Sequence, residues 1–302
     1  MSYSKRQFIK HVAAVSALTS IHPLFLTSAS TTPPKNEVNV FPIGMGTWIT
    51  FNVGQDKALR LQRAQVLKTF FELGGQMVDS SPMYGSAEEV LGFCFQQLNG
   101  TNNLFSATKT WTSSLPEAKQ QFVDSQQRWQ LPNFDLLQVH NLVAWQQNLA
   151  MLRELKQQKL IRYIGITTSH GRRHNELLKI MQNQEIDFVQ LTYNIDDREV
   201  ERRILPLAHE RGIRVIANRP LQGGRLMDLT NNKALPSWAS KIGCHNWAQF
   251  FLRFIISHPA VTCAIPATSK VEHMVENMGS VNNIPLPNAQ ERIKMINAFK
   301  AL

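Results

Sequence analysis

Two groups that can do acid–base chemistry lie close together in the stretch 74–85, GGQMVDSSPMYG. Asp79 follows residues 76–78, a short segment typical of a buried strand, and Tyr84 lies in the loop that Gly85 closes. A carboxylate and a phenol at this spacing could form half of an acid–base site. The simpler alternative is that Asp79 caps a turn and Tyr84 packs on the rim, because aspartate is common in turns for local reasons.

Lys109 and His140 stand in the same kind of position, each at the end of a strand-like segment. Residues 104–108 precede Lys109, and residues 134–139 precede His140. In an eight-stranded parallel barrel the carboxyl ends of the strands meet on one face, where catalytic groups are placed. Alone, His140 could be a histidine satisfied within the core, but together with the other three residues it favours a catalytic site.

The segments that carry these residues alternate with helical patterns from Val38 onward. Strands are predicted at residues 43–46, 76–78, 104–108, 134–139, 161–167, 187–191, 213–218 and 261–265. Helical spacing of apolar residues is found at residues 57–73, 87–98, 114–129, 145–155, 174–182, 199–211, 247–257, 270–278 and 288–299. This alternation predicts the α/β class and one (β/α)8 TIM barrel over residues 38–302.

The composition is that of an ordinary globular protein. The chain has 302 residues, a formal net charge of +10, 43% hydrophobic residues and 18% charged residues. Lysine and arginine are scattered rather than interleaved with aromatic residues, which favours a polyanionic cofactor over a nucleic acid as the binding partner. The cysteines are Cys94, Cys244 and Cys263; they have no C-x-x-C spacing, so neither a structural disulfide nor a metal site is expected.

Residues 1–30 differ from the rest and predict a signal for export. A basic start with Lys5 and Arg6 precedes apolar, small-residue segments that end near Ala29. These segments are too short and too polar for a membrane-spanning helix, so no stable membrane insertion is expected. Residues 31–37 contain two prolines and predict a linker. The alternative for residues 1–30 is a disordered or amphipathic N-terminal tail.

The set Asp79, Tyr84, Lys109 and His140 resembles the catalytic tetrad of the aldo-keto reductases. The flanking sequences agree: GMGTW from residue 44, VDSSPMYGSAEEVLG from residue 78, LLQVHN from residue 136 and YIGITT from residue 163. The resemblance extends from about Val38 to the C-terminus. It implies that Tyr84 donates a proton, that Lys109 lowers the pKa of Tyr84, that Asp79 holds Lys109, and that His140 orients the substrate carbonyl.

The resemblance also implies a nicotinamide cofactor, with Tyr193 stacked on its ring. The residues implied in cofactor binding are Gly46, Thr47, Trp48, Thr167, Gln190, Tyr193, Arg219, Leu221, Thr268, Ser269, Lys270, Glu276 and Asn277. Trp48 and Asn141 are implied in substrate binding. A capping box of Ser269 with Glu272 is expected to start the helix beside the phosphate site. NADPH is the expected cofactor, and NADH stays open because His273 stands where the family has an arginine.

Three hypotheses for function follow. The first is NADPH-dependent reduction of an aldehyde or ketone, or alcohol oxidation in reverse. The second is a nucleotide-binding redox sensor with little turnover, as the potassium-channel β-subunits of the same family suggest. The third is a barrel lyase or isomerase without nicotinamide, which Gln190 and Tyr193 disfavour.

The basic start of the chain resembles a twin-arginine signal with Lys5 in place of the first arginine. It implies a periplasmic or exported protein, or a cytoplasmic one if the signal is not used. The oligomeric state does not follow from the sequence.

Overall fold

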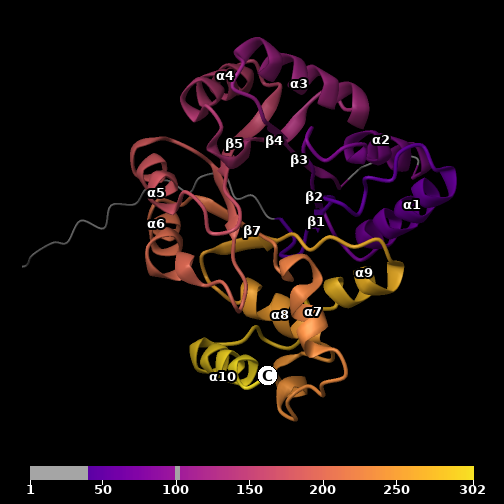
Figure 1. Ribbon diagram of the computed structural model, residues 1–302, viewed down its shortest axis with the longest axis vertical. Coiled ribbons are helices and arrows are strands. Elements are labelled where there is room, and N and C mark those ends of the chain that lie inside the picture. The colour runs from indigo at the N-terminus through magenta and orange to yellow at the C-terminus, as the bar shows by residue number, and fades with distance from the viewer. Residues whose placement is uncertain (1–39, 99–102) are drawn as a thin grey trace, which may run out of the picture. The chain divides into compact units, whose positions relative to one another are not determined.

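A computed structural model describes residues 40–98 and 103–302, and the segments predicted as an export signal (1–30) and a linker (31–37) lie outside them. Eight parallel strands form one sheet in the order β1 to β8 (Figure 1). Their bounds are β1 Met45–Gly46, β2 Met77–Asp79, β3 Phe105–Thr110, β4 Phe134–Val139, β5 Ile161–Thr167, β6 Phe188–Thr192, β7 Arg214–Asn218 and β8 Val261–Ala264. The predicted α/β class and (β/α)8 barrel are confirmed.

The barrel closes between its first and last strands through short bridges rather than a long ladder. Ile43 pairs with Ala264, and Gly46 pairs with Ala267, both in parallel orientation. The Gly46 amide donates to the Pro266 carbonyl at 3.0 Å. A Cβ atom on Gly46 would lie 3.0 Å from the Ile265 carbonyl oxygen, which is a tight contact with backbone, so glycine favours this close approach.

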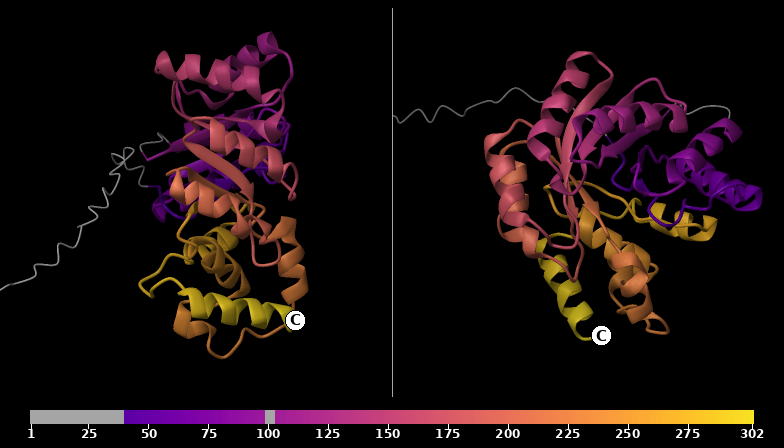
Figure 2. Two further views of the ribbon diagram at one scale, coloured as in Figure 1. Left: turned by 90° about the vertical axis from the view of Figure 1, so that its left-hand side faces the viewer. Right: turned by 45° about the horizontal axis from the view of Figure 1, so that its top comes forward.

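Helices connect the strands and cover the outside of the barrel (Figures 1 and 2). Their bounds are α1 Lys57–Glu72, α2 Ala87–Gln97, α3 Leu115–Trp129, α4 Trp145–Gln157, α5 His174–Asn183, α6 Ile204–Glu210, α7 Arg225–Thr230, α8 Trp247–Ile256, α9 Val271–Met278 and α10 Ala289–Lys300. Asp56 and Ser114 accept backbone N–H bonds at the starts of α1 and α3, as N-caps do. Within the described part of the chain, no helix has the length and apolarity needed to cross a membrane.

Three local features differ from the sequence-based expectations. The single helix predicted at residues 199–211 is a 3-10 turn, Glu199–Arg202, followed by α6. Pro206 explains the break, because a proline is tolerated only in the first turn of a helix. The loop after β7 contains α7, which was not predicted. The predicted cap at Ser269 is wrong, since α9 begins after Lys270 without a side-chain cap.

Strand alternation stacks two layers of side chains inside the barrel. The first layer is apolar and is formed by Met77, Phe105, Ala107, Leu136, Phe188, Ile216 and Cys263. The second layer is polar. Its residues follow four members of the first layer by two positions, so their side chains are on the same face of each strand: Asp79, Lys109, Gln138 and Gln190. Asp79 accepts hydrogen bonds from the other three residues. Gln138 and Gln190 reach it from β4 and β6, which do not neighbour β2, so these side chains must point into the barrel. The polar layer therefore sits on an apolar floor, toward the carboxyl ends of the strands.

Candidate active site

A buried ion pair forms the centre of the polar layer. Lys109 Nζ lies 2.6 Å from Asp79 Oδ2, and the two side chains are 0% and 3% exposed. The same ammonium donates to the Ser80 carbonyl at 2.7 Å. The other carboxylate oxygen, Asp79 Oδ1, accepts from Gln190 Nε2 at 2.9 Å and from Gln138 Nε2 at 3.1 Å. The carboxylate is therefore fixed by three donors from three different strands.

The surroundings keep Lys109 positively charged. Burial by itself would lower its pKa, but Asp79 and then Tyr84 act in the opposite direction, and the pKa is raised above its ordinary value. A charged ammonium is thus held inside the barrel mouth, where little water screens it. The pair can stabilise an anion that develops next to it.

Tyr84 lies beside this ammonium. Lys109 Nζ is 5.2 Å from the centre of the Tyr84 ring, and the tyrosine is half-buried in the loop after β2. Burial raises the pKa of Tyr84; Lys109 lowers it, but by less. Lys109 thus acts on the pKa of Tyr84 in the predicted direction, but in the free protein desolvation outweighs the cation and the net shift is upward. Tyr84 keeps its proton at neutral pH and can donate it.

His140 follows β4 directly and faces Tyr84. The two ring centres are 5.8 Å apart and the rings are inclined by 83°. Burial, with a smaller effect of Lys109, lowers the pKa of His140 to about 3, so the imidazole is neutral. Its Nδ1 atom lies 3.0 Å from the hydroxyl oxygen of Ser81. The tetrad predicted from sequence is thus assembled from three strand ends and one loop.

A second group of predicted residues lies around the mouth, at the ends of β5 and β6. Thr167 Oγ1 accepts the Asn141 amide at 3.0 Å, so this hydroxyl already holds the loop after β4. The hydroxyl of Thr168 is buried and has no hydrogen-bond partner among the described residues. Gln190 contacts Asp79 directly. Thr168 therefore offers a second hydroxyl beside that of Thr167, which accepts a bond and keeps its own hydrogen to donate.

Tyr193 is placed elsewhere, and the predicted stacking on a nicotinamide ring is wrong. Its side chain is fully buried, its ring packs near Phe254 of α8, and its hydroxyl donates to Glu201 Oε1 at 2.6 Å. Arg292 of α10 binds both the hydroxyl and Glu201. The ring therefore lies between the barrel and its outer helices rather than at the mouth.

The residues predicted to hold the rest of the cofactor come from β1, β7 and β8. Thr47 Oγ1 donates to the Asp79 carbonyl at 2.9 Å, whereas Trp48 next to it is 45% exposed. Arg219 has a left-handed backbone conformation with φ of 50°, and Leu221 packs against the core. These residues thus follow the carboxyl ends of β1 and β7.

The segment after β8 has the features of an anion site. Thr268 Oγ1 accepts the Lys270 amide at 3.1 Å, and the side chain of Lys270 is exposed. The α9 helix that follows has no side-chain cap, so its first N–H groups are available to an anion. Asn277 is buried on α9, and Glu276 is half-buried beside it.

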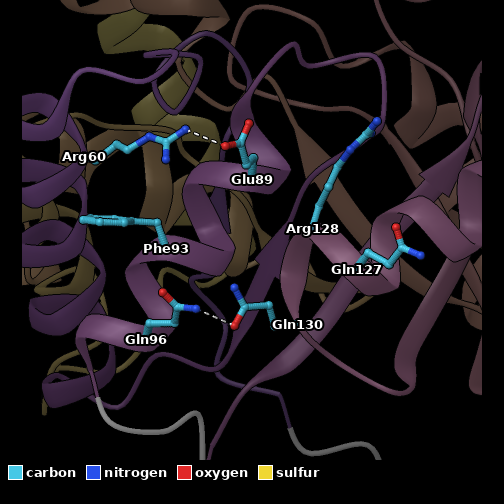
Figure 3. A pocket seen from close by; sticks show the side chains of 7 residues that line it. All are labelled: Arg60, Glu89, Phe93, Gln96, Gln127, Arg128 and Gln130. Carbon is cyan, nitrogen blue, oxygen red and sulfur yellow. Dashed lines mark hydrogen bonds and ion pairs between the residues drawn. The ribbon is translucent and has the colours of Figure 1, made fainter.

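A hollow of about 330 Å³ on the protein surface lies apart from this site (Figure 3). It is lined by side chains of α1, α2 and α3 and contains none of the residues described above. Arg60 is paired there with Glu89 at 2.9 Å, and Gln96 donates to Gln130 at 2.8 Å. Four of its polar side chains thus bind one another in two pairs.

Three residues of the site were not found from the sequence. Gln138 supports Asp79, Ser81 contacts His140, and Asn218 at the end of β7 donates to the Thr168 carbonyl at 2.9 Å. Gln138 had a usable signal, because it precedes His140 by two positions and so shares its face of the strand. Ser81 had none, because its contact depends on the path of the turn after β2.

The arrangement brings a buried ion pair, a phenol and a neutral imidazole together at the carboxyl ends of the barrel strands, and such groups can do acid–base chemistry. The family model of the aldo/keto reductases matches residues 42–300, so the chain belongs to the aldo/keto reductase family. The protein is thereby an oxidoreductase that acts on carbonyl groups. The assignment agrees with the family that the four sequence motifs indicate.

Individual relatives show the same similarity over most of the chain. Methylglyoxal reductase YeaE of Escherichia coli (strain K12) is 27% identical over 261 residues, which covers 85% of this chain and 90% of that protein. The NADH-specific methylglyoxal reductase of the same organism is 26% identical over 239 residues, with coverage of 67% and 70%. The crystal structure of an aldo/keto reductase from Klebsiella pneumoniae in complex with NADP and acetate has a TM-score of 0.73 and 25% identity. The similarity covers 86% of this chain and 92% of the Klebsiella pneumoniae chain.

Proposed function

We propose that this protein reduces an aldehyde or ketone to an alcohol with NADPH, and that Tyr84 donates the proton. The observation that carries the proposal is the position of Tyr84 between a buried ammonium and a neutral imidazole. Lys109 lies 5.2 Å from the ring centre on one side, and the His140 ring centre lies 5.8 Å away on another. Such a set can protonate an oxygen that becomes negative.

The residues at the mouth fit a nicotinamide dinucleotide. The buried, unpaired hydroxyl of Thr168 can bind a carboxamide, and the open N-terminus of α9 with the exposed Lys270 can bind a phosphate. When bound, the cofactor supplies the hydride. The Klebsiella pneumoniae relative is in complex with NADP, whereas one Escherichia coli relative is named NADH-specific, so NADH remains the alternative cofactor.

The proton comes from one defined atom of the protein, the hydroxyl oxygen of Tyr84. The Tyr84 hydroxyl gives its proton to the substrate oxygen, and the phenolate that remains is stabilised by the charge on Lys109. Asp79 keeps this ammonium in place with an ion pair of 2.6 Å. An isolated ammonium in the barrel would be costly, so the carboxylate is required for the charge to be present.

His140 acts as a neutral donor in this proposal. Because the pKa of His140 is lowered to about 3, the ring does not compete with Tyr84 as an acid at neutral pH. Its N–H group can bind the carbonyl oxygen and hold it near the tyrosine hydroxyl. The orientation of the carbonyl and its protonation are thus assigned to different residues.

The test compares Tyr84→Phe with the matched variant Tyr163→Phe. Tyr163 stacks on Phe105 at the opposite end of the barrel, so this variant removes a tyrosine hydroxyl far from the site. With methylglyoxal and larger aldehydes as probes, Tyr84→Phe is expected to lower kcat about 10²- to 10⁴-fold and to keep NADPH binding. Tyr163→Phe is expected to keep both. Equal activity of wild type and Tyr84→Phe would refute the proposed role.

A further inference from the structure

We infer that Ser81 is a positioning residue that holds His140 in the tautomer with its proton on Nε2. The inference rests on the proposed function, in which His140 donates a hydrogen bond to the substrate carbonyl. It concerns a residue that precedes Tyr84 by three positions and has no direct part in the proton transfer. Ser81 is 0% exposed, and its hydroxyl oxygen lies 3.0 Å from His140 Nδ1.

The direction of this hydrogen bond follows from the acceptors that the Ser81 hydroxyl contacts. The Met83 backbone amide donates to Ser81 Oγ at 3.4 Å, and an amide N–H can act only as a donor. Ser81 Oγ therefore accepts there and has its own hydrogen to donate. Among the residues that the structure describes, His140 Nδ1 is the acceptor in contact with this hydroxyl. The serine donates, and Nδ1 is the bare nitrogen.

A neutral imidazole carries one proton, so a bare Nδ1 places that proton on Nε2. The opposite tautomer would direct two N–H donors at one buried oxygen and would leave the serine hydrogen without an acceptor. Buried polar groups that lose their partners are costly. The Ser81 turn therefore selects the tautomer that has a donor available for the substrate.

The neutral state of the ring makes this selection necessary. Burial keeps His140 uncharged, with a pKa of about 3. A charged imidazolium would carry protons on both nitrogens and would need no tautomer control. Because the neutral ring has one proton, Nε2 can donate to the substrate only when Nδ1 is bare, and Ser81 favours this state by donating to Nδ1.

The test is the ¹⁵N spectrum of histidine-labelled protein, in which a protonated and a bare ring nitrogen have well-separated shifts. His140→Gln identifies the His140 signals. Ser81→Ala removes the donor, and Ser80→Ala is the matched control. Ser80 is equally buried and adjacent, but its hydroxyl has no partner among the described residues. The carbonyl that Ser80 offers to Lys109 is kept in an alanine.

In the wild type and in Ser80→Ala, His140 is expected to show a bare Nδ1 and a protonated Nε2. In Ser81→Ala, a mixture of tautomers is expected, with kcat/KM lowered about tenfold, the value of one hydrogen bond. A protonated Nδ1 in the wild type would overturn the inference, as would an unchanged His140 pattern in Ser81→Ala. The spectrum needs no turnover. An inactive wild type with the expected pattern would therefore refute the proposed function and leave the tautomer assignment supported.

Discussion

The buried His140 makes the stability of the folded protein depend on pH in a way that can be calculated. Its pKa is lowered from 6.5 to about 3, first by burial and then by Lys109. The unfolded chain therefore binds a proton at His140 below about pH 6.5, where the folded chain does not. Because the unfolded state binds more protons, the free energy of unfolding decreases as the pH falls through this window. The loss continues until the folded pKa is reached.

The size of the effect follows from the shift. Each pH unit within the window changes the free energy of unfolding by about 1.4 kcal/mol per group. Between about pH 7 and about pH 5, which lies above the folded pKa, His140 alone lowers the free energy of unfolding by about 2 kcal/mol. Replacement of His140 by glutamine removes the titrating group and should remove this part of the pH dependence.

The assay is urea unfolding at both pH values, followed by tryptophan fluorescence, for the wild type and His140→Gln. The pKa values of His170 and His258 are also lowered by burial, but these residues are present in both proteins and cancel in the comparison. The wild type is expected to lose about 2 kcal/mol more than the variant on acidification. Equal losses would show that His140 is not held neutral, and the argument for its role as a neutral donor would fail.

Three further predictions concern the ion pair, the cofactor and the leader. Lys109→Met should lower the free energy of unfolding by about 3–5 kcal/mol because it leaves a buried carboxylate unpaired, and adding Asp79→Asn should recover most of it in the same urea assay. A double variant as unstable as the single one would contradict this. Thr168→Val should weaken NADPH binding about tenfold in a fluorescence titration without destabilising the free protein, since the lost hydroxyl has no partner there. Unchanged NADPH affinity would remove Thr168 from the proposed cofactor site. If residues 1–30 direct twin-arginine export, Arg6→Lys should abolish the periplasmic fraction measured by cell fractionation, and an unchanged fraction would exclude that route.

Most of the fold could be predicted because a parallel barrel is encoded by a simple repeat. Each buried strand is followed by a helical pattern, and punctuating residues such as Pro116 and Gly212 mark the boundaries. The tetrad could be found for the same reason, since three of its members lie at strand ends. The break before α6 had a usable signal in Pro206 that the helical pattern of residues 199–211 outweighed, whereas the short helix α7 depends on tertiary packing.

The error at Tyr193 has a physical cause that the sequence itself contains. Gln190 faces the interior and Thr192 shares its side of the strand, so Tyr193 has the opposite parity and points outward. Its hydroxyl then binds Glu201, in the 3-10 turn that follows β6, and Arg292, which lies far along the chain in α10. Contacts such as Ser81 with His140 are of another kind, because they depend on the path of a turn rather than on strand period.

The central claim is that NADPH bound at the barrel mouth gives its hydride to a carbonyl group and that Tyr84 donates the proton. The most direct measurement uses NADPH that carries deuterium in place of its transferable hydrogen, followed by mass spectrometry of the alcohol formed. Wild-type protein is expected to give alcohol with one deuterium per molecule, and Tyr84→Phe to bind the nucleotide but give almost none. Folded wild-type protein that binds NADPH and yields no deuterated alcohol from any aldehyde or ketone would contradict the account.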